Sequence, residues 1–333
     1  MRRVAVLGAG SWGTALAVHL GRAGHDVRLW ARDAGLVDEM RGRRANAVYL
    51  PDVMLPAPVR PTDRLDEAVD GAAVVLCAVP SHGCRDVMRR AAPALAPGAV
   101  LVSATKGLEA GSLQRMSEVI AQEAVGHHVA VLSGPSFALE VAREQPTAVL
   151  VACANDDARA LVQEEFRGPA LRLYGSSDVV GVELCGALKN VIAIAAGVVE
   201  GSALGHNALA ALITRGLAEI ARLTVAAGGQ RDTPAGLSGL GDLVLTCTGS
   251  LSRNRHVGIE LARGRALDDI VAGMKMVAEG VRTTGAALDL AQRYDVELPI
   301  ATQMAALLDG RIDVRAGLEA LMLRRQRSEH ESA

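Results

Sequence analysis

Two patterns of apolar residues follow one another along the chain. In the first half, strand-length apolar runs alternate with stretches of helical periodicity. These runs are residues 3–7, 26–30, 73–79, 99–104, 129–132, 147–153 and 171–174. Most of them end at Gly, Pro or Ser. Fully apolar strands separated by helices predict a parallel, doubly wound α/β sheet covered on both faces.

The second pattern begins with residues 176–200, which are apolar on every side of a 3.6-residue helix and start with Ser and Asp residues that favour an N-cap. Such a helix is buried. Lys189 lies in its middle, and no carboxylate stands three or four residues away to pair with it. Its partner therefore comes from elsewhere in the chain, unless the lysine reaches solvent from a partly exposed helix.

Every later segment has helix length. The segments are residues 209–226, 255–263, 267–272, 284–292, 300–308 and 314–325. We expect an all-helical second domain over residues 179–333, after an α/β domain over residues 1–178.

The first predicted strand leads into a Gly-x-Gly-x-x-Gly motif that opens a helix. Gly8 allows the tight turn, Gly10 allows a pyrophosphate to approach the backbone, and Gly13 packs the helix on the sheet. The motif predicts a dinucleotide-binding, Rossmann-type domain. Arg32 follows the second strand and suits the 2′-phosphate of NADP, whereas Asp33 is expected to cap the next helix.

Polar residues follow the ends of several predicted strands, where ligands of doubly wound sheets bind. They include Pro80-Ser81, Thr105-Lys106-Gly107 and residues 133–138. We expect Lys106 to point toward the nucleotide, although a lysine on an exposed loop has the same local sequence. Residues 236–254 are rich in Gly, Ser and Thr and end at Arg253 before a helix, which suits a phosphate or carboxylate. An irregular loop with capping serines is the alternative.

Composition narrows the function. The 333 residues suffice for about two domains, and a net charge of −2 with 2% aromatic residues argues against nucleic-acid binding. Lysine supplies only three of the 35 basic residues, at Lys106, Lys189 and Lys275, which indicates sites that need an amine. Five scattered cysteines, no signal segment and no apolar run near the ~20 residues of a membrane span favour the cytoplasm.

Several blocks, in order and over nearly the whole chain, carry a family resemblance. They are GAGSWGTALA, SATKGLE, LSGPSFALEVA, ELCGALKNVIAIAAG, GLSGLGDLVLTCTGSLSRN and VAEGVRTTGAA. Together they resemble the bacterial NAD(P)-dependent sn-glycerol-3-phosphate dehydrogenases. The resemblance implies a Rossmann domain followed by a helical substrate-binding domain. It also implies reversible reduction of dihydroxyacetone phosphate to sn-glycerol 3-phosphate, a precursor of phospholipids.

The resemblance also implies roles for individual residues. Lys189 would be the proton donor and acceptor at the substrate oxygen. The implied substrate contacts are Lys106, Gly134, Ser136, Lys189, Asp242, Ser252, Arg253 and Asn254. The implied cofactor contacts are Ser11, Trp12, Arg32, Lys106, Ala138, Arg253, Val277 and Glu279, beside Gly8, Gly10 and Gly13.

The residues themselves suggest a mechanism that agrees with the resemblance. As hydride from NADPH or NADH reaches the ketone carbon, the Lys189 ammonium would stabilise the growing charge on its oxygen and donate a proton. No metal is expected, because the eight histidines form no ligand cluster.

Two other functions are compatible with these residues. A hydroxyacid or ketopantoate-type dehydrogenase would share the domains and the lysine, and a non-catalytic nicotinamide-nucleotide sensor would share the glycines. We further expect a small phosphorylated substrate and a homodimer formed through Ala- and Leu-rich helical faces.

Overall fold

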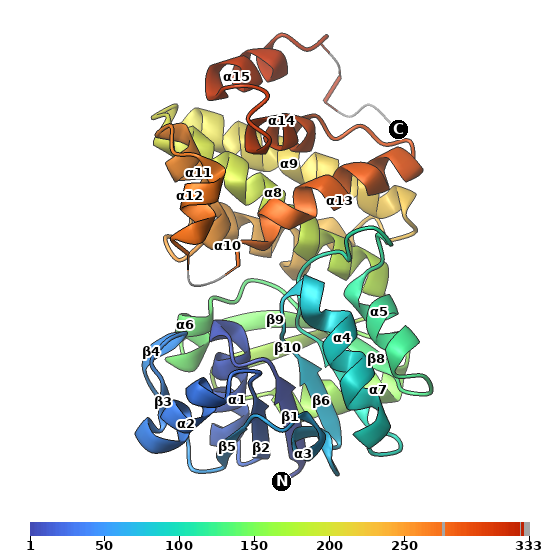
Figure 1. The fold of residues 1–333 in the computed structure, drawn as a ribbon. Helices are drawn as coiled ribbons and strands as arrows, with labels where there is room; N and C mark the ends of the chain where they lie inside the picture. The colour runs from blue at the N-terminus through green and yellow to red at the C-terminus, as the bar shows by residue number, and fades with distance from the viewer. Residues whose placement is uncertain (275–276, 327, 330–333) are drawn as a thin grey trace. The chain divides into compact units, whose positions relative to one another are not determined.

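A computed structural model describes residues 1–274, 277–326 and 328–329. The chain divides into two compact units. The first comprises Met1–Glu109 and Gln114–Glu183, and the second comprises Ala110–Leu113 and the chain from Leu184 onward. Figure 1 shows the helices and strands of both units, coloured by their order in the chain.

An eight-stranded sheet organises the first unit, with strands in the order β10-β9-β8-β7-β6-β1-β2-β5. The strands of the unit are β1 (Arg3–Leu7), β2 (Asp26–Trp30), β3 (Ala45–Asn46), β4 (Leu50–Met54), β5 (Val59–Thr62), β6 (Val74–Cys77), β7 (Val100–Ser103), β8 (Val129–Ser133), β9 (Thr147–Ala152) and β10 (Leu171–Ser176). Strands β3 and β4 form a separate antiparallel pair.

Helices cover both faces of the sheet, as the apolar runs predicted. They are α1 (Ser11–Arg22), α2 (Ala34–Arg43), α3 (Leu65–Val69), α4 (Ser81–Ala91), α5 (Met116–Glu123), α6 (Ala138–Ala142) and α7 (Asp156–Phe166). One buried apolar cluster joins the sheet to α1, α2, α6 and α7, and another joins its opposite face to α3, α4 and α5. The predicted doubly wound α/β class is therefore confirmed.

The direction of two strands differs from the prediction. Strand β9 runs antiparallel to β8 and parallel to β10, so the sheet is mixed. An apolar run of strand length has the same composition whichever way the strand runs in its sheet, and the pattern therefore could not reveal this reversal. The short strands β3, β4 and β5 were also missed, because Pro51 and Pro61 interrupt two of them.

The second unit contains helices throughout its described residues. They are α8 (Val179–Gly201), which begins in the first unit, α9 (Gly205–Ala226), α10 (Asp242–Thr248), α11 (Arg253–Ala262), α12 (Leu267–Ala272), α13 (Glu279–Arg293), α14 (Pro299–Leu308) and α15 (Val314–Met322). Residues 236–254, expected as a possible loop, instead contain a π-helical turn at Leu237–Gly241 and then α10.

Helix α8 runs through the middle of the helical unit (Figure 1), and nearly all its residues from Val182 to Val198 are buried. It meets α11 where two glycines face each other. A Cβ at Gly197 would lie 1.9 Å from the Arg255 carbonyl oxygen, and one at Gly258 would lie 1.9 Å from that of Ile194. The two backbones can approach this closely only without side chains at these positions.

Among the described residues, α8 alone has the length and composition of a helix that could cross a membrane. However, 89% of the qualifying window is buried inside the protein. The core helix of a globular unit meets the same criterion, and its burial here is that of a core helix.

Candidate active site

The glycine turn of the first unit connects β1 to α1. Gly8 has φ +109°, and a Cβ there would lie 2.9 Å from the main chain of Ala78. A Cβ on Gly13 would lie 1.9 Å from the Gly8 carbonyl oxygen. Gly10, in contrast, has no neighbouring atom within 4 Å of where its Cβ would be. The turn is therefore closely packed at Gly8 and Gly13 and open at Gly10, as a phosphate-binding turn requires.

Ser11 and Trp12, which follow the turn, differ in their hydrogen bonding. The Ser11 hydroxyl donates to the Tyr49 carbonyl oxygen at 2.6 Å, and the helix has no side-chain N-cap. The Trp12 indole Nε1–H is buried and has no acceptor among the described residues. A dinucleotide fits this turn, because the first N–H groups of α1 and an open glycine suit a pyrophosphate.

The two residues after β2 behave differently. Arg32 is exposed. Asp33 caps α2, since its Oδ1 accepts hydrogen bonds from the backbone N–H groups of Gly35 and Leu36 at 2.8 and 3.2 Å. The capping role predicted for Asp33 is confirmed, and the 2′-phosphate role of Arg32 stays a prediction.

Strands β8, β7, β6 and β1 are parallel neighbours, so their carboxyl ends meet at one edge of the sheet. The glycine turn, Lys106 and Gly134 all follow strands at this edge. Half-buried Lys106 donates from Nζ to the Gly134 carbonyl oxygen at 3.0 Å, and the Ser136 hydroxyl donates to the same oxygen at 2.9 Å. Ala138, a predicted cofactor contact, begins α6 directly afterwards.

Lys189 is buried in the second unit, with its side chain 7% exposed. Its Nζ donates to Asp242 Oδ1 and to the Thr246 hydroxyl oxygen, both at 2.6 Å. The Thr246 hydroxyl in turn donates to the Asp242 carbonyl oxygen at 2.6 Å. The partner of Lys189 thus comes from a distant segment, as its apolar helical neighbours predicted.

Sequence reasoning missed Thr246. Asp242 and Thr246 stand four residues apart on α10 and therefore share one face of that helix. A helical interpretation of residues 242–248 would have identified the pair. Cys247, next in sequence, is buried, and this burial raises its thiol pKa to about 12, with nearby Lys189 acting in the opposite direction. Cys247 therefore stays a neutral thiol beside the ion pair.

Two asparagines connect the segments that contain Lys189, Arg253 and Glu279. Asn254 Nδ2 donates to Asn190 Oδ1 at 3.0 Å, and Asn254 Oδ1 accepts from the Gly280 N–H at 3.0 Å. The three members of this Asn190–Asn254–Gly280 network each follow one of those site residues in sequence. Asn190 was not identified from the sequence.

The N-terminus of α11 holds the other predicted anion contacts. Ser252 is the N-cap, and its Oγ accepts from the Arg255 N–H at 3.3 Å. Arg253 keeps part of its surface exposed, yet protein atoms surround much of its side chain. This desolvation lowers the Arg253 pKa, while the Glu279 carboxylate acts in the opposite direction. Val277 and Glu279 precede and begin α13, whereas Lys275 lies outside the described residues.

The described residues contain no group of three or more His, Cys, Asp or Glu side chains that could hold a metal ion. The site residues described above combine a glycine turn that fits a dinucleotide with a buried, hydrogen-bonded lysine. These features place the chain in the class of nicotinamide-nucleotide-dependent dehydrogenases with an α/β unit and a helical unit.

Comparison with known proteins defines the family. Residues 3–159 match the N-terminal model of NAD-dependent glycerol-3-phosphate dehydrogenase, and residues 178–319 match its C-terminal model. The chain belongs to the NAD-dependent glycerol-3-phosphate dehydrogenase family.

Individual relatives agree with this assignment. The chain is 54% identical to glycerol-3-phosphate dehydrogenase [NAD(P)+] of Koribacter versatilis, over 92% of this chain and 93% of that protein. It is 52% identical to the enzyme of the same description from Nitratidesulfovibrio vulgaris, over 98% and 100%. The crystal structure of glycerol-3-phosphate dehydrogenase from Coxiella burnetii matches with a TM-score of 0.94 at 40% identity, over 97% of this chain and 99% of that one.

Proposed function

We propose that this chain reduces dihydroxyacetone phosphate to sn-glycerol 3-phosphate, with Lys189 as the proton donor in this direction and the proton acceptor in the reverse one. The family and the named relatives support the reaction and the use of NAD or NADP. The observation that supports the role of the lysine is the pair of 2.6 Å hydrogen bonds from its Nζ to Asp242 and Thr246.

These two hydrogen bonds determine what Lys189 can do. An ammonium has three N–H donors. Asp242 and Thr246 set the direction of two, and therefore of the third. A neighbouring carboxylate also favours the charged form of a buried amine. A directed ammonium can stabilise negative charge on the substrate oxygen and then donate a proton to it, and such general-acid catalysis contributes about 10²–10⁴-fold.

When bound, NADH or NADPH supplies the hydride that reduces the ketone carbon. Gly8, Gly10, Gly13 and the N-terminus of α1 would hold its pyrophosphate, with Trp12 donating from Nε1. Arg32 would contact the 2′-phosphate of NADPH, so the chain would use NADPH beside NADH. The further proposed cofactor contacts are Ser11, Lys106, Ala138, Arg253, Val277 and Glu279.

The substrate phosphate would bind at the N-terminus of α11. Arg253 supplies the positive charge there, and the helix supplies backbone N–H groups and its dipole. Asn254 would donate its second Nδ2–H, because its first is used for Asn190. Gripping the phosphate positions the ketone through the end of the molecule that does not react. Lys106, Gly134, Ser136 and Ser252 are the further proposed substrate contacts.

A single assay tests the reaction against the alternatives. Purified protein is mixed with NADPH or NADH and either dihydroxyacetone phosphate or an unphosphorylated 2-keto acid, and nicotinamide absorbance is followed. We expect oxidation only with the phosphorylated ketone. Consumption of the keto acid alone would indicate a hydroxyacid-type dehydrogenase. Cofactor binding without oxidation of either ketone would indicate a nucleotide sensor.

We also propose that the product supplies phospholipid synthesis, that the chain acts in the cytoplasm and that it forms a homodimer. All five cysteines are buried thiols, which suits a reducing compartment. Leu240, Val244 and Leu251 of the helical unit expose apolar side chains, which supports self-association. Light scattering of the purified protein tests the dimer: a mass of one chain, 34.6 kDa, at every concentration would exclude it.

A further inference from the structure

The segment that follows Lys106 folds back on itself. Leu108 and Arg115 form an antiparallel bridge, and the Glu109 N–H donates to the Gln114 carbonyl oxygen at 2.9 Å. Residues 108–115 therefore make a loop with two adjacent arms, here called the 108–115 loop. Lys106 lies two residues before its first arm, so the position of that arm limits where Lys106 can be.

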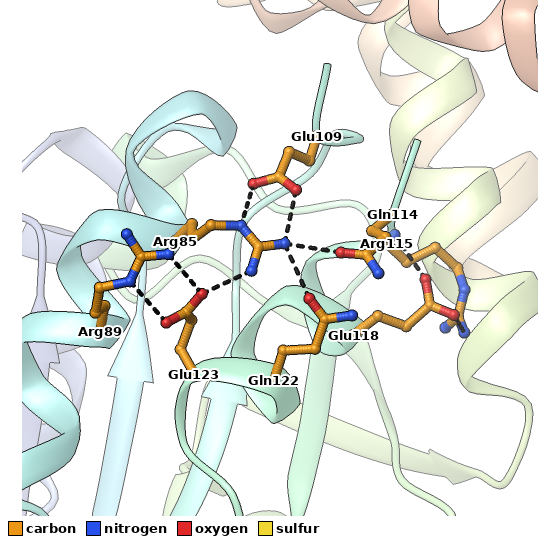
Figure 2. A network of polar contacts seen from close by, with 8 residues as sticks. All are labelled: Arg85, Arg89, Glu109, Gln114, Arg115, Glu118, Gln122 and Glu123. Atoms are coloured by element: carbon orange, nitrogen blue, oxygen red, sulfur yellow. Dashed lines mark hydrogen bonds and ion pairs between the residues drawn. The ribbon is translucent and has the colours of Figure 1, made fainter. Parts of the chain in front are cut away.

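Arg85 on α4 holds both arms of this loop (Figure 2). Its Nε and Nη2 donate to the two carboxylate oxygens of Glu109 at 2.8 and 2.7 Å. The same Nη2 donates to Gln114 Oε1 at 2.7 Å. Nη1 donates to Glu123 Oε1 on α5 at 2.6 Å. One guanidinium thus ties the first arm, the second arm and two helices together.

These contacts differ from an ordinary surface ion pair. The side chains of Arg85, Glu109 and Glu123 are 26%, 19% and 12% exposed, so solvent screens their attraction only in part. The Glu109 and Glu123 carboxylates raise the pKa of Arg85, and the Arg89 and Arg85 guanidinium groups lower that of Glu123. A planar fork can hold two carboxylates and an amide at once, whereas a lysine ammonium cannot reproduce this geometry.

Lys106 is fixed from its other side by Thr105. The Thr105 hydroxyl donates at 2.7 Å to the carbonyl oxygen of Val79, which stands two residues after the end of β6. Helix α4 begins two residues later, at Ser81, and contains Arg85 one turn further on. Lys106 therefore lies between two anchors, Thr105 before it and Glu109 after it, and both connect to the β6–α4 segment.

We propose that Arg85 is a positioning residue for Lys106. It holds Glu109 and Gln114, and so fixes the main chain from which Lys106 reaches the Gly134 carbonyl oxygen. This inference rests on the proposed function, in which Lys106 contacts substrate and cofactor.

Arg89 provides a matched control. It lies on the same helix and donates twice to Glu123, at 3.0 Å each, but it touches neither arm of the loop and its side chain is 62% exposed. Arg85→Met and Arg89→Met remove the same charge from neighbouring turns of α4. If the missing charge or the α4–α5 contact lowers the activity, both variants lose activity. If the released 108–115 loop lowers the activity, only Arg85→Met loses it.

The test measures kcat/KM for dihydroxyacetone phosphate in Arg85→Met, Arg89→Met, Lys106→Met and the double variant Arg85→Met/Lys106→Met. Since misplacement of a contact group by about 1 Å costs up to ~100-fold, we expect Arg85→Met to lose about 10-fold or more. Arg89→Met is expected to stay close to the parent. In the Lys106→Met background, Arg85→Met is expected to cause no further loss, because the side chain that it positions is already gone.

Three outcomes would overturn the proposal. Equal losses in the Arg85 and Arg89 variants would assign the effect to charge or to α4–α5 packing. Losses that multiply in the double variant would show that Arg85 acts independently of Lys106. A fully active Lys106→Met would refute the proposed role of Lys106, and the inference with it. If Arg85→Met does not fold, Glu109→Gln takes its place, alone and combined with Lys106→Met. This variant weakens the same Arg85–Glu109 contact by removing the charge of the carboxylate.

Discussion

At the scale of single residues, the chemistry depends on how Lys189 is held. Burial takes an ammonium out of contact with water, and such a group needs hydrogen-bond acceptors in place of the water. Asp242 supplies charge and Thr246 supplies a hydroxyl oxygen at the same distance, 2.6 Å. The Thr246 hydroxyl hydrogen is directed to the Asp242 carbonyl oxygen, so its oxygen faces Lys189 as an acceptor.

Thr246→Val tests this arrangement. The variant keeps the shape of the side chain and removes one acceptor from Lys189. A hydrogen bond to a charged group contributes about 1.5–3 kcal/mol, so we expect kcat to fall about 10-fold or more. Thr248→Val is the matched control, since exposed Thr248 stands on the same helix and donates only to its own turn, at Val244. Equal kcat values in the two variants would contradict the role of Thr246.

At the scale of elements, the Asn190–Asn254–Gly280 network joins helices α8, α11 and α13 through hydrogen bonds. A Cβ at Gly280 would lie 2.6 Å from the Asn190 carbonyl oxygen and 2.9 Å from Asn254 Oδ1. No residue with a side chain fits there unless the helices move. The network therefore fixes the three segments that contain Lys189, Arg253 and Glu279.

Gly280→Ala should push these segments apart. Overpacking of this kind costs about 1–3 kcal/mol, so we expect a lower melting temperature together with a lower kcat/KM. Gly285→Ala, on the same helix, meets no atom within 4 Å, and the better helix propensity of alanine should raise the stability slightly. Calorimetry and steady-state kinetics on both variants provide the comparison. Parental kinetics in Gly280→Ala would show that the network does not position the site.

The elements also show what the sequence could predict. Strands β1 and β2 begin and end where they were predicted, because the apolar residues of each run stop at a break, which is Gly8 after β1 and the polar Arg32 and Asp33 shortly after β2. The buried position of Lys189 followed from the apolar neighbours on all sides of its helix. The direction of β9 and the partner Thr246 could not be predicted, because the first depends on tertiary pairing and the second on a helix in a Gly- and Ser-rich segment.

At the scale of the whole molecule, a buried carboxylate makes stability depend on pH. Glu219 on α9 is 4% exposed, and its Oε1 accepts from the Ile300 N–H at 2.7 Å at the start of α14. Burial raises its pKa from 4.5 to about 7, against the backbone hydrogen bonds from Ile300 and Ala301. The folded protein therefore binds a proton more tightly here than the unfolded chain does.

The sign of the effect follows from proton linkage. The stability due to Glu219 is fully present below its unfolded pKa and is lost as pH rises through the folded value, about 7. The shift corresponds to about 3 kcal/mol at most. Glu219→Gln cannot ionise, so its stability relative to the parent should increase between about pH 5 and about pH 8. Melting temperatures across this range provide the measurement, and parallel curves for parent and variant would refute the assignment. Glu297→Gln, an exposed carboxylate paired with Arg324, is the control.

Amine rescue of Lys189→Ala tests whether Lys189 transfers the proton. We expect this variant to bind NADPH normally and to reduce dihydroxyacetone phosphate at least about 100-fold more slowly than the parent. Added methylamine or ethylamine should restore part of the rate, because a small primary ammonium can occupy the place of Nζ. Turnover of Lys189→Ala at the parental rate without added amine would contradict the role of Lys189 as the proton donor.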